Sequence, residues 1–137
     1  MIIDSSVVIH AFLKGEFATK ARDVLAVDDL CAPDVMISEV ANVLGRMVRT
    51  KLIQTAHAAE LFSRVKKLPL RFIPSRELID RAFDLSLELS HPIFDCYYLE
   101  LAIRERLPFV TTDDHFIQKL RPRPYAINII HLNDWTP

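Results

Sequence analysis

Short apolar runs alternate along the chain with longer segments of helical periodicity. The clearest helical segment covers residues 34–50, where apolar side chains recur at Met36, Val40, Val43 and Met47. Spacings of three and four residues place these side chains on one face of a helix. The same reading of the whole chain predicts strands at 1–4, 30–32, 70–73, 108–111 and 127–132, and helices at 6–13, 17–27, 34–50, 54–67, 76–90, 94–106 and 113–120.

This alternation of strands and helices predicts the fold class. Strands that are separated by helices pair in parallel, because each connection crosses over the sheet in a right-handed sense. We therefore expect an α/β fold: a three-layer α/β/α sandwich around a mostly parallel sheet, with residues 1–137 forming a single domain. In open sheets of this kind, ligands bind beyond the carboxyl ends of the strands, where the strand order reverses.

Composition excludes several classes of protein. Hydrophobic residues make up 50% of the chain and charged residues 26%, which favours a folded protein with a substantial core. Two cysteines give no disulfide framework, so a reduced, cytoplasmic setting is expected. No apolar run has the length of a membrane span, and two glycines exclude a glycine-rich phosphate loop. A net charge of −1 argues against a generally basic nucleic-acid binder, though not against a local basic patch.

Four carboxylates stand where the predicted fold has its functional edge. Asp4 ends the first strand, in IIDSS, and Asp113 ends a late strand, in FVTTDD. Asp95 falls in the first turn of the helix at 94–106, and Glu39 lies on the helix at 34–50. On that helix, the spacing places Glu39 in one polar stripe together with Asn42, Arg46 and Arg49.

Carboxylates that converge repel one another unless a hard cation neutralises them. Ligands that are all oxygen favour Mg²⁺ or Mn²⁺, and such a site is suited to the hydrolysis of phosphodiester bonds. Each acid also has a simpler explanation. Asp4 and Asp113 are both typical helix caps, Asp95 suits a helix dipole, and Glu39 fits a solvated helix face. The joint placement of the four acids favours the metal site.

Three segments carry a family resemblance. They are IIDSSVVIHAFL (2–13), ISEVANVL (37–44) and FDCYYLELAIRERLPFVTTDDHF (94–116), in this order. Together they resemble PIN-domain ribonucleases, and within that family the VapC toxins of bacterial toxin–antitoxin pairs. The resemblance extends from Met1 to about Trp135. It implies a five-stranded parallel sheet, a homodimer, a cognate VapB-like antitoxin, and Mg²⁺- or Mn²⁺-dependent endonucleolytic cleavage of structured RNA such as tRNA or rRNA.

The resemblance also implies roles for individual residues. Asp4, Glu39, Asp95 and Asp113 match the metal-binding, catalytic acids of the family, whereas Asp114 stands outside that set. Asn42 matches the asparagine of the E-x-x-N motif. Ser6 matches a small polar position that supports water at the metal, and Thr112, next to the last acid, is a second supporting candidate.

Basic and aromatic residues outside the acid set have two explanations each. Arg46, Arg49 and Lys51 are candidate contacts for RNA phosphates, but the end of a helix also favours cations. Tyr97 and Tyr98 are expected to pack in the interior rather than stack on bases. His10, His57, His91 and His131 are scattered and show no ligand spacing, and His115, next to the last acid, is expected to be a surface histidine rather than a phosphate contact. Two alternative functions stay open: a catalytically weak RNA-binding module of the same fold, and a DNA-directed nuclease that uses the same chemistry.

Overall fold

A single all-parallel sheet forms the centre of the protein. The computed structural model describes residues 1–125 and 128–137. The strands are arranged in the order β3-β2-β1-β4-β5, and every neighbouring pair is parallel. The α/β prediction is therefore confirmed, with a sheet that is wholly parallel. The strands are β1 (Ile2–Ile3), β2 (Cys31–Pro33), β3 (Arg71–Ile73), β4 (Phe109–Thr111) and β5 (Ile129–His131).

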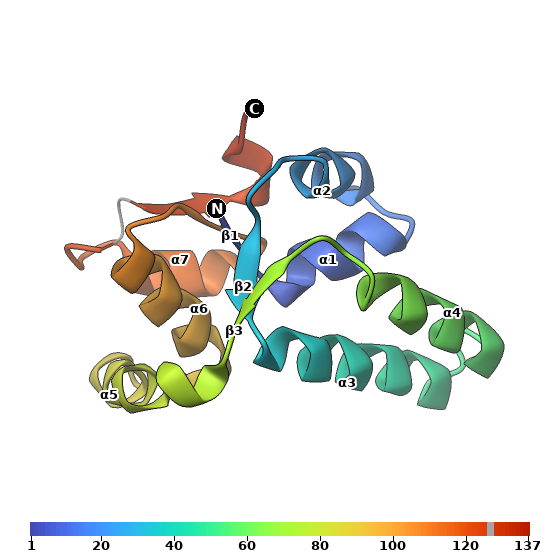
Figure 1. Cartoon of the computed structure of the whole chain (residues 1–137), viewed down its shortest axis with the longest axis horizontal. Helices are drawn as coiled ribbons and strands as arrows, with labels where there is room; N and C mark the ends of the chain where they lie inside the picture. Colours follow the sequence, from blue (N-terminus) through green and yellow to red (C-terminus); the bar gives the residue numbers. More distant parts are fainter. Residues whose placement is uncertain (126–127) are drawn as a thin grey trace.

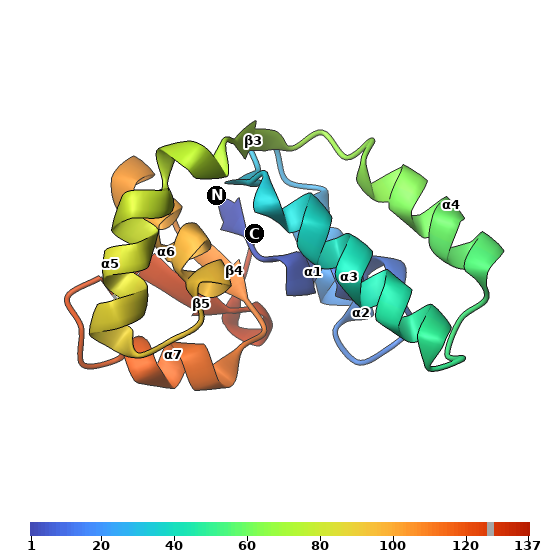
Figure 2. The ribbon, with the colours of Figure 1, turned by 90° about the horizontal axis from the view of Figure 1, so that it is seen from below.

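Helices cover both faces of this sheet. In two perpendicular views, α1 to α4 lie on one side of the strands and α5 to α7 on the other (Figures 1 and 2). Right-handed crossovers produce this division, because the chain moves outward from β1 in one direction and then returns to build the sheet in the other. The helices are α1 (Ser5–Phe12), α2 (Ala18–Leu25), α3 (Val35–Arg49), α4 (Thr55–Val65), α5 (Ile79–Leu89), α6 (Ile93–Glu105) and α7 (Asp114–Leu120).

The predicted elements are present, with ends that differ from the prediction by one or two residues in most of them, and the larger differences lie in the later part of the chain. The helix expected at 76–90 is split into a 3-10 turn, η1 (Ser75–Glu77), and α5. The last strand, expected at 127–132, is β5 followed by a second 3-10 turn, η3 (Leu132–Asp134), and residue 127 lies outside the described part of the chain. The strand expected at 30–32 is shifted by one residue: Pro33 is the last residue of β2, in register with Ile73 of β3, and the end of a strand is where proline disturbs a sheet least.

The strand order reverses beside β1, and this determines where a site can form. β2 and β4 flank β1, and Ile2 and Ile3 pair with Phe109 and Val110. The backbone N–H of Asp4 donates to the carbonyl of Val110 at 3.1 Å, so the pairing continues one residue past β1. The chain segments that follow β1 and β4 therefore leave the sheet side by side at its switch point.

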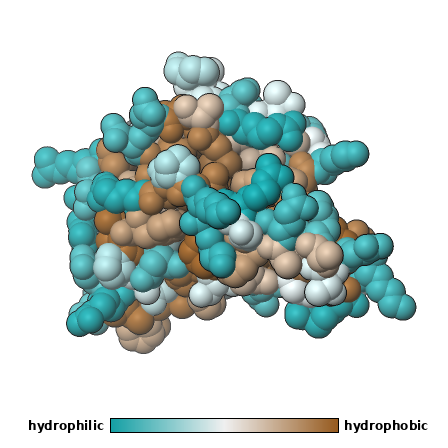
Figure 3. Space-filling view, turned by 45° about the vertical axis from the view of Figure 1, so that its right-hand side comes forward, coloured by the Kyte–Doolittle hydropathy of each residue, from teal (hydrophilic) through white to brown (hydrophobic). Residues whose placement is uncertain are grey.

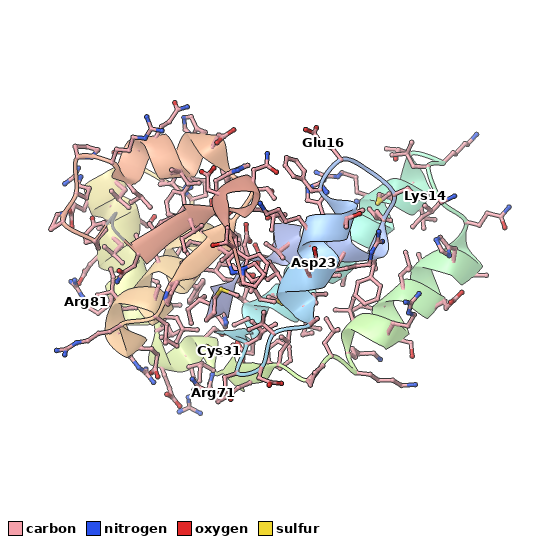
Figure 4. All side chains as sticks on the ribbon, turned by 90° about the horizontal axis from the view of Figure 1, so that it is seen from above. Lys14, Glu16, Asp23, Cys31, Arg71 and Arg81 are labelled. Atoms are coloured by element: carbon pink, nitrogen blue, oxygen red, sulfur yellow. The ribbon has the colours of Figure 1, made fainter. Side chains whose placement is uncertain are left out.

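Helix α6 is the most deeply buried helix against the sheet. Every side chain from Cys96 to Ala102 is buried, including both tyrosines, as expected. The ring of Tyr98 stacks on that of Phe109 from β4, with centroids 5.8 Å apart and planes 5° from parallel. Both thiols, Cys31 and Cys96, are buried and free. Cys31 lies beside Arg71 of the neighbouring strand (Figure 4).

Apolar residues also reach the surface. One face shows apolar side chains between charged ones (Figure 3). The large side chains that are more than a third exposed include Phe83 on α5 and Phe94 on α6.

Replacing Phe109 with alanine tests the packing between α6 and the sheet. Phe109 is 1% exposed, so the change opens a cavity beneath Tyr98, and we expect the free energy of unfolding to fall by about 3–5 kcal/mol. Urea denaturation measures this loss. The matched control is Phe83→Ala, at a ring that is 53% exposed, which should cost less than about 1 kcal/mol. Equal losses from the two substitutions would contradict the packing described here.

Candidate active site

Asp4 stands in a ring of hydroxyl donors. Its carboxylate is 6% exposed, and its Oδ2 accepts hydrogen bonds from Ser6 Oγ at 2.8 Å and from Thr111 Oγ1 at 2.7 Å. Ser5 Oγ donates to Oδ1 at 3.2 Å. These donors compensate the loss of water around a buried carboxylate. The Asp4 side chain makes no cap hydrogen bond to α1, so the capping explanation does not account for it.

Thr111, which sequence reasoning missed, supports Asp4 through its side chain, whereas the predicted Thr112 contributes through its backbone. Thr111 is opposite Asp4 in the parallel register, so its side chain falls on the same face of the sheet. Its hydroxyl donates to Asp4 and accepts the backbone N–H of Asp113 at 3.1 Å. Thr112 contributes its backbone N–H, which donates to Ser6 Oγ at 3.4 Å. Thr111 thereby joins the two acids that follow β1 and β4.

Asp113 has both of the roles that its sequence position indicated: it is an acid at the end of a strand, and it caps the helix that follows. It ends the β4 segment beside Asp4, and its Oδ1 accepts the backbone N–H of Phe116 at 2.8 Å, which caps α7. The capping explanation is therefore correct for one of its oxygens. Asp114 begins α7 with a side chain that is 77% exposed. Of the two adjacent aspartates, Asp113 therefore lies at the switch point and Asp114 on the surface.

Glu39 reaches toward the same place from α3. Its Oε2 accepts a hydrogen bond from the hydroxyl of Tyr98, which is buried on α6. Burial raises the pKa of Glu39 from 4.5 to about 7; the charges of Asp4 and Asp95 also raise it, and the Tyr98 bond acts in the opposite direction. Burial and the neighbouring acids thus favour the protonated form of the Glu39 carboxyl more strongly than in a free glutamate, and its pKa is raised accordingly.

Asp95 lies in the first turn of α6, as predicted, and pairs with a histidine. Its Oδ2 is 2.6 Å from His91 Nε2, and His91 Nδ1 is 3.3 Å from Lys119 Nζ. A lysine ammonium can only donate, so Nδ1 accepts and Nε2 carries the ring proton that is donated to Asp95. Burial raises the pKa of Asp95, with Asp4 and Asp113 adding to the effect, whereas the bond from His91 lowers it.

His91 was not found by sequence reasoning. It is only 8% exposed, and its ring stacks on that of Phe116 at a centroid distance of 4.4 Å. Ser86 Oγ donates to its carbonyl at 2.6 Å. His91 lies just before α6, separated from it by Pro92, and is four residues before Asp95, the spacing of one helical turn. The signal available in the sequence was this four-residue spacing across the start of a helix that has an acid in its first turn.

The four acids lie close enough for their charges to interact. Asp4 and Asp95 both act on Glu39, and Asp4 and Asp113 both act on Asp95. The donors are all oxygen, which fits Mg²⁺ or Mn²⁺. Within residues 1–125 and 128–137, no three carboxylate, imidazole or thiol groups are oriented to hold a metal ion together. Mg²⁺ is commonly held by one or two carboxylates plus waters and substrate phosphates, so this donor set still suits it.

The remaining candidates lie along α3 or just after it. Asn42 lines a hollow together with Glu39. Arg46 and Arg49 are exposed along the same face of α3. Lys51 follows the helix with φ at 60°, which turns the chain away from the helix axis. The polar stripe thus consists of α3 residues only.

Comparison with known families identifies the fold. The model of the PIN domain matches residues 1–120. The chain belongs to the PIN domain family. PIN domains are generally nucleases, which agrees with a cluster of acids at the switch point of the sheet.

Two solved structures share this PIN fold. A chain of a toxin–antitoxin complex from Klebsiella pneumoniae is 15% identical, with a TM-score of 0.67 over 96% of each chain. PAE2754 from Pyrobaculum aerophilum is 17% identical, with a TM-score of 0.74 over 96% of this chain and 83% of that one. No curated protein matches the sequence. In the described part of the chain, no helix has the length and apolar character needed to cross a membrane.

Replacing Glu39 with glutamine should change how stability depends on pH. Because folding raises this pKa from 4.5 to about 7, the folded protein binds more protons than the unfolded chain in that range, and stability falls as pH rises through it. In chelator, we expect the melting temperature of Glu39→Gln to fall less than that of the wild type between about pH 5 and about pH 8. Parallel melting curves for the two proteins would contradict the burial of a Glu39 carboxylate among other acids.

Proposed function

We propose that this PIN domain is a Mg²⁺- or Mn²⁺-dependent endoribonuclease and the toxin of a type II toxin–antitoxin pair. Its substrate would be structured RNA, with tRNA or rRNA as the expected class. The observation that carries the proposal is the meeting of Asp4, Glu39, Asp95 and Asp113 at the switch point of a PIN sheet, each with its own hydrogen-bond donor.

In this proposal a divalent ion would bind among the four acids, held by one or two of their carboxylates and by water, and the ion would bind the substrate phosphate. A bound ion would neutralise charge on the phosphate and make water more acidic. Hydrogen bonds within the protein orient the acids before the ion binds. Hydroxyls of Ser6 and Thr111 orient Asp4, and His91 orients Asp95. Tyr98 orients Glu39, whose carboxylate would help to position the attacking water beside the ion.

The exposed arginines of α3 are proposed to bind RNA beyond the acids. Arg46 and Arg49 lie one and two turns along the helix from Asn42. Guanidinium groups bind phosphates of any sequence, so these contacts would add affinity and salt dependence without selecting bases. Lys51 would act in the same way from the start of the next loop.

A VapB-like antitoxin is the proposed protein partner. The Klebsiella pneumoniae chain of the same fold comes from a toxin–antitoxin complex, which supports this assignment. An acidic site attracts a basic side chain, so an antitoxin that covers the acids would be steered there by charge. A homodimer and a cytoplasmic location complete the proposal.

Asparagine at Asp95 or Asp113 should abolish cleavage. Each substitution removes a negative charge from the site while keeping nearly the same shape, so we expect turnover of RNA to fall by roughly a hundredfold or more, with the melting temperature retained. Chelation of divalent ions should have the same effect on the wild type. Gel analysis of RNA fragments measures both.

The matched control for these variants is Asp114→Asn, which changes the neighbouring, exposed acid and should leave cleavage within a few-fold of the wild type. Loss of cleavage in Asp114→Asn as severe as in Asp113→Asn would mean that the acids are assigned wrongly. Cleavage of DNA but not RNA would favour the DNA-directed nuclease. RNA binding without any turnover would favour the binding module.

Metal affinity should depend on His91. In His91→Ala, Asp95 loses the donor that orients it, and we expect Mn²⁺ binding to weaken by about 10–100-fold. In His91→Gln, the side-chain amide can place an N–H near the position of Nε2, so much of the affinity should return. Titration of Mn²⁺ followed by electron paramagnetic resonance measures both variants without RNA. Equal affinity in the alanine variant and the wild type would show that His91 does not orient the site.

A further inference from the structure

A hollow of about 320 Å³ opens beside the acids, and the mechanism above does not use it. It is lined by Ser5, Ser38, Glu39, Asn42, Val43 and Phe94. These residues come from the starts of α1 and α6 and from the first half of α3. The hollow therefore lies where the two helical layers meet at the switch point of the sheet.

The lining residues connect the hollow directly to the acid cluster. Ser5 follows Asp4 in the chain, and Phe94 precedes Asp95. Glu39 belongs to both places, since its carboxyl group lines the hollow and interacts with the other acids. A molecule in the hollow would therefore lie next to a phosphate bound at the acids.

Phe94 is unusual for its helix. From Cys96 to Ala102, α6 is buried on every side, yet the ring of Phe94 is 51% exposed. An exposed aromatic ring at the mouth of a candidate active site offers a flat apolar face. Val43 adds a second apolar surface to the lining.

Hydrogen-bonding groups line the same hollow. Ser38 and Asn42 are one helical turn apart on α3, and both are exposed. Within the part of the chain that the structure describes, neither side chain has a hydrogen-bond partner in the protein. An amide group offers donors and an acceptor together, and a hydroxyl offers both as well. The hollow contains no lysine or arginine, so it suits a neutral polar ring better than a phosphate.

We propose that this hollow is a nucleobase subsite. In it, a single-stranded RNA base next to the scissile phosphate stacks on Phe94, and its edge bonds to Asn42 and Ser38. Proteins read single-stranded RNA in this way, with an aromatic face below the base and polar groups at its edge. An apolar side chain of a partner protein would leave Asn42 and Ser38 unpaired. The proposal rests on the RNA-directed function argued above.

The α3 stripe provides a path for the rest of the strand. Beyond Asn42, the same face of the helix carries Arg46 and then Arg49, both exposed. A strand whose base sits in the hollow can therefore place neighbouring phosphates on these arginines. In this arrangement the hollow contacts one base, whereas the arginines of α3 contact only the RNA backbone.

Binding of RNA that carries 2-aminopurine tests the subsite. All variants are made in Asp113→Asn protein, so that the RNA stays intact, and are measured with Mg²⁺ and with chelator. We expect Phe94→Leu, which keeps an apolar side chain but loses the ring, to lower affinity by roughly five-fold to a hundredfold, the effect of one lost base stack. Phe94→Trp should retain affinity, and 2-aminopurine at the bound position should lose fluorescence on binding.

The control is Phe83→Leu, which changes an equally exposed ring on α5 that does not line the hollow. It should leave affinity unchanged. The subsite is overturned if Phe94→Leu binds RNA as the parent does, if the two leucine variants lose affinity equally, or if the parent binds no RNA. It is also overturned if Phe94→Leu changes only self-association in sedimentation, or only antitoxin binding, since a protein then covers the ring.

These outcomes separate the subsite from the nuclease. If the wild type cleaves RNA and Phe94→Leu neither binds nor cleaves it differently, the subsite fails and the nuclease stands. If RNA binding depends on Phe94 but no metal supports cleavage, the nuclease fails and the subsite stands.

Discussion

Repulsion among carboxylates is the constraint around which this structure is organised. Glu39 and Asp95 both have raised pKa values, because burial and neighbouring acids disfavour their charged forms. The fold offsets this with one dedicated set of donors for each acid. Hydroxyls bond to Asp4, Tyr98 bonds to Glu39, His91 to Asp95, and the first turn of α7 to Asp113. A residual cost remains, and a divalent cation is the simplest means of removing it.

The topology of the sheet explains how acids from distant parts of the sequence meet. Pairing of β1 with β4 brings the segments after Ile3 and Thr111 out of the sheet together. The layers on the two sides then contribute one acid each, from α3 and from α6. The groups that support the acids also connect different elements: Thr111 joins the two strand ends, and Tyr98 joins α6 to α3. Packing and chemistry are therefore linked: Tyr98 stacks on Phe109 and also donates to Glu39.

Much of this could be predicted from sequence, and the exceptions have physical reasons. Apolar periodicity and alternation predicted the parallel sheet, and the ends of strands pointed to Asp4 and Asp113. The choice between Thr111 and Thr112 depends on strand register, which two neighbouring threonines do not reveal. His91 lies outside the helix that carries Asp95, so its contact arises from the turn at Pro92 and from packing on Phe116. Exposure of Phe94 in the first turn of a helix whose middle is buried was likewise invisible to periodicity.

The most direct test of the central claim is to map new RNA ends after total bacterial RNA is incubated with purified, antitoxin-free wild-type protein, in Mg²⁺, in Mn²⁺ or in chelator. We expect discrete new ends at defined positions in structured RNA, present with either metal and absent in chelator. A folded protein that produces no new ends with metal, or the same ends in chelator, would contradict it.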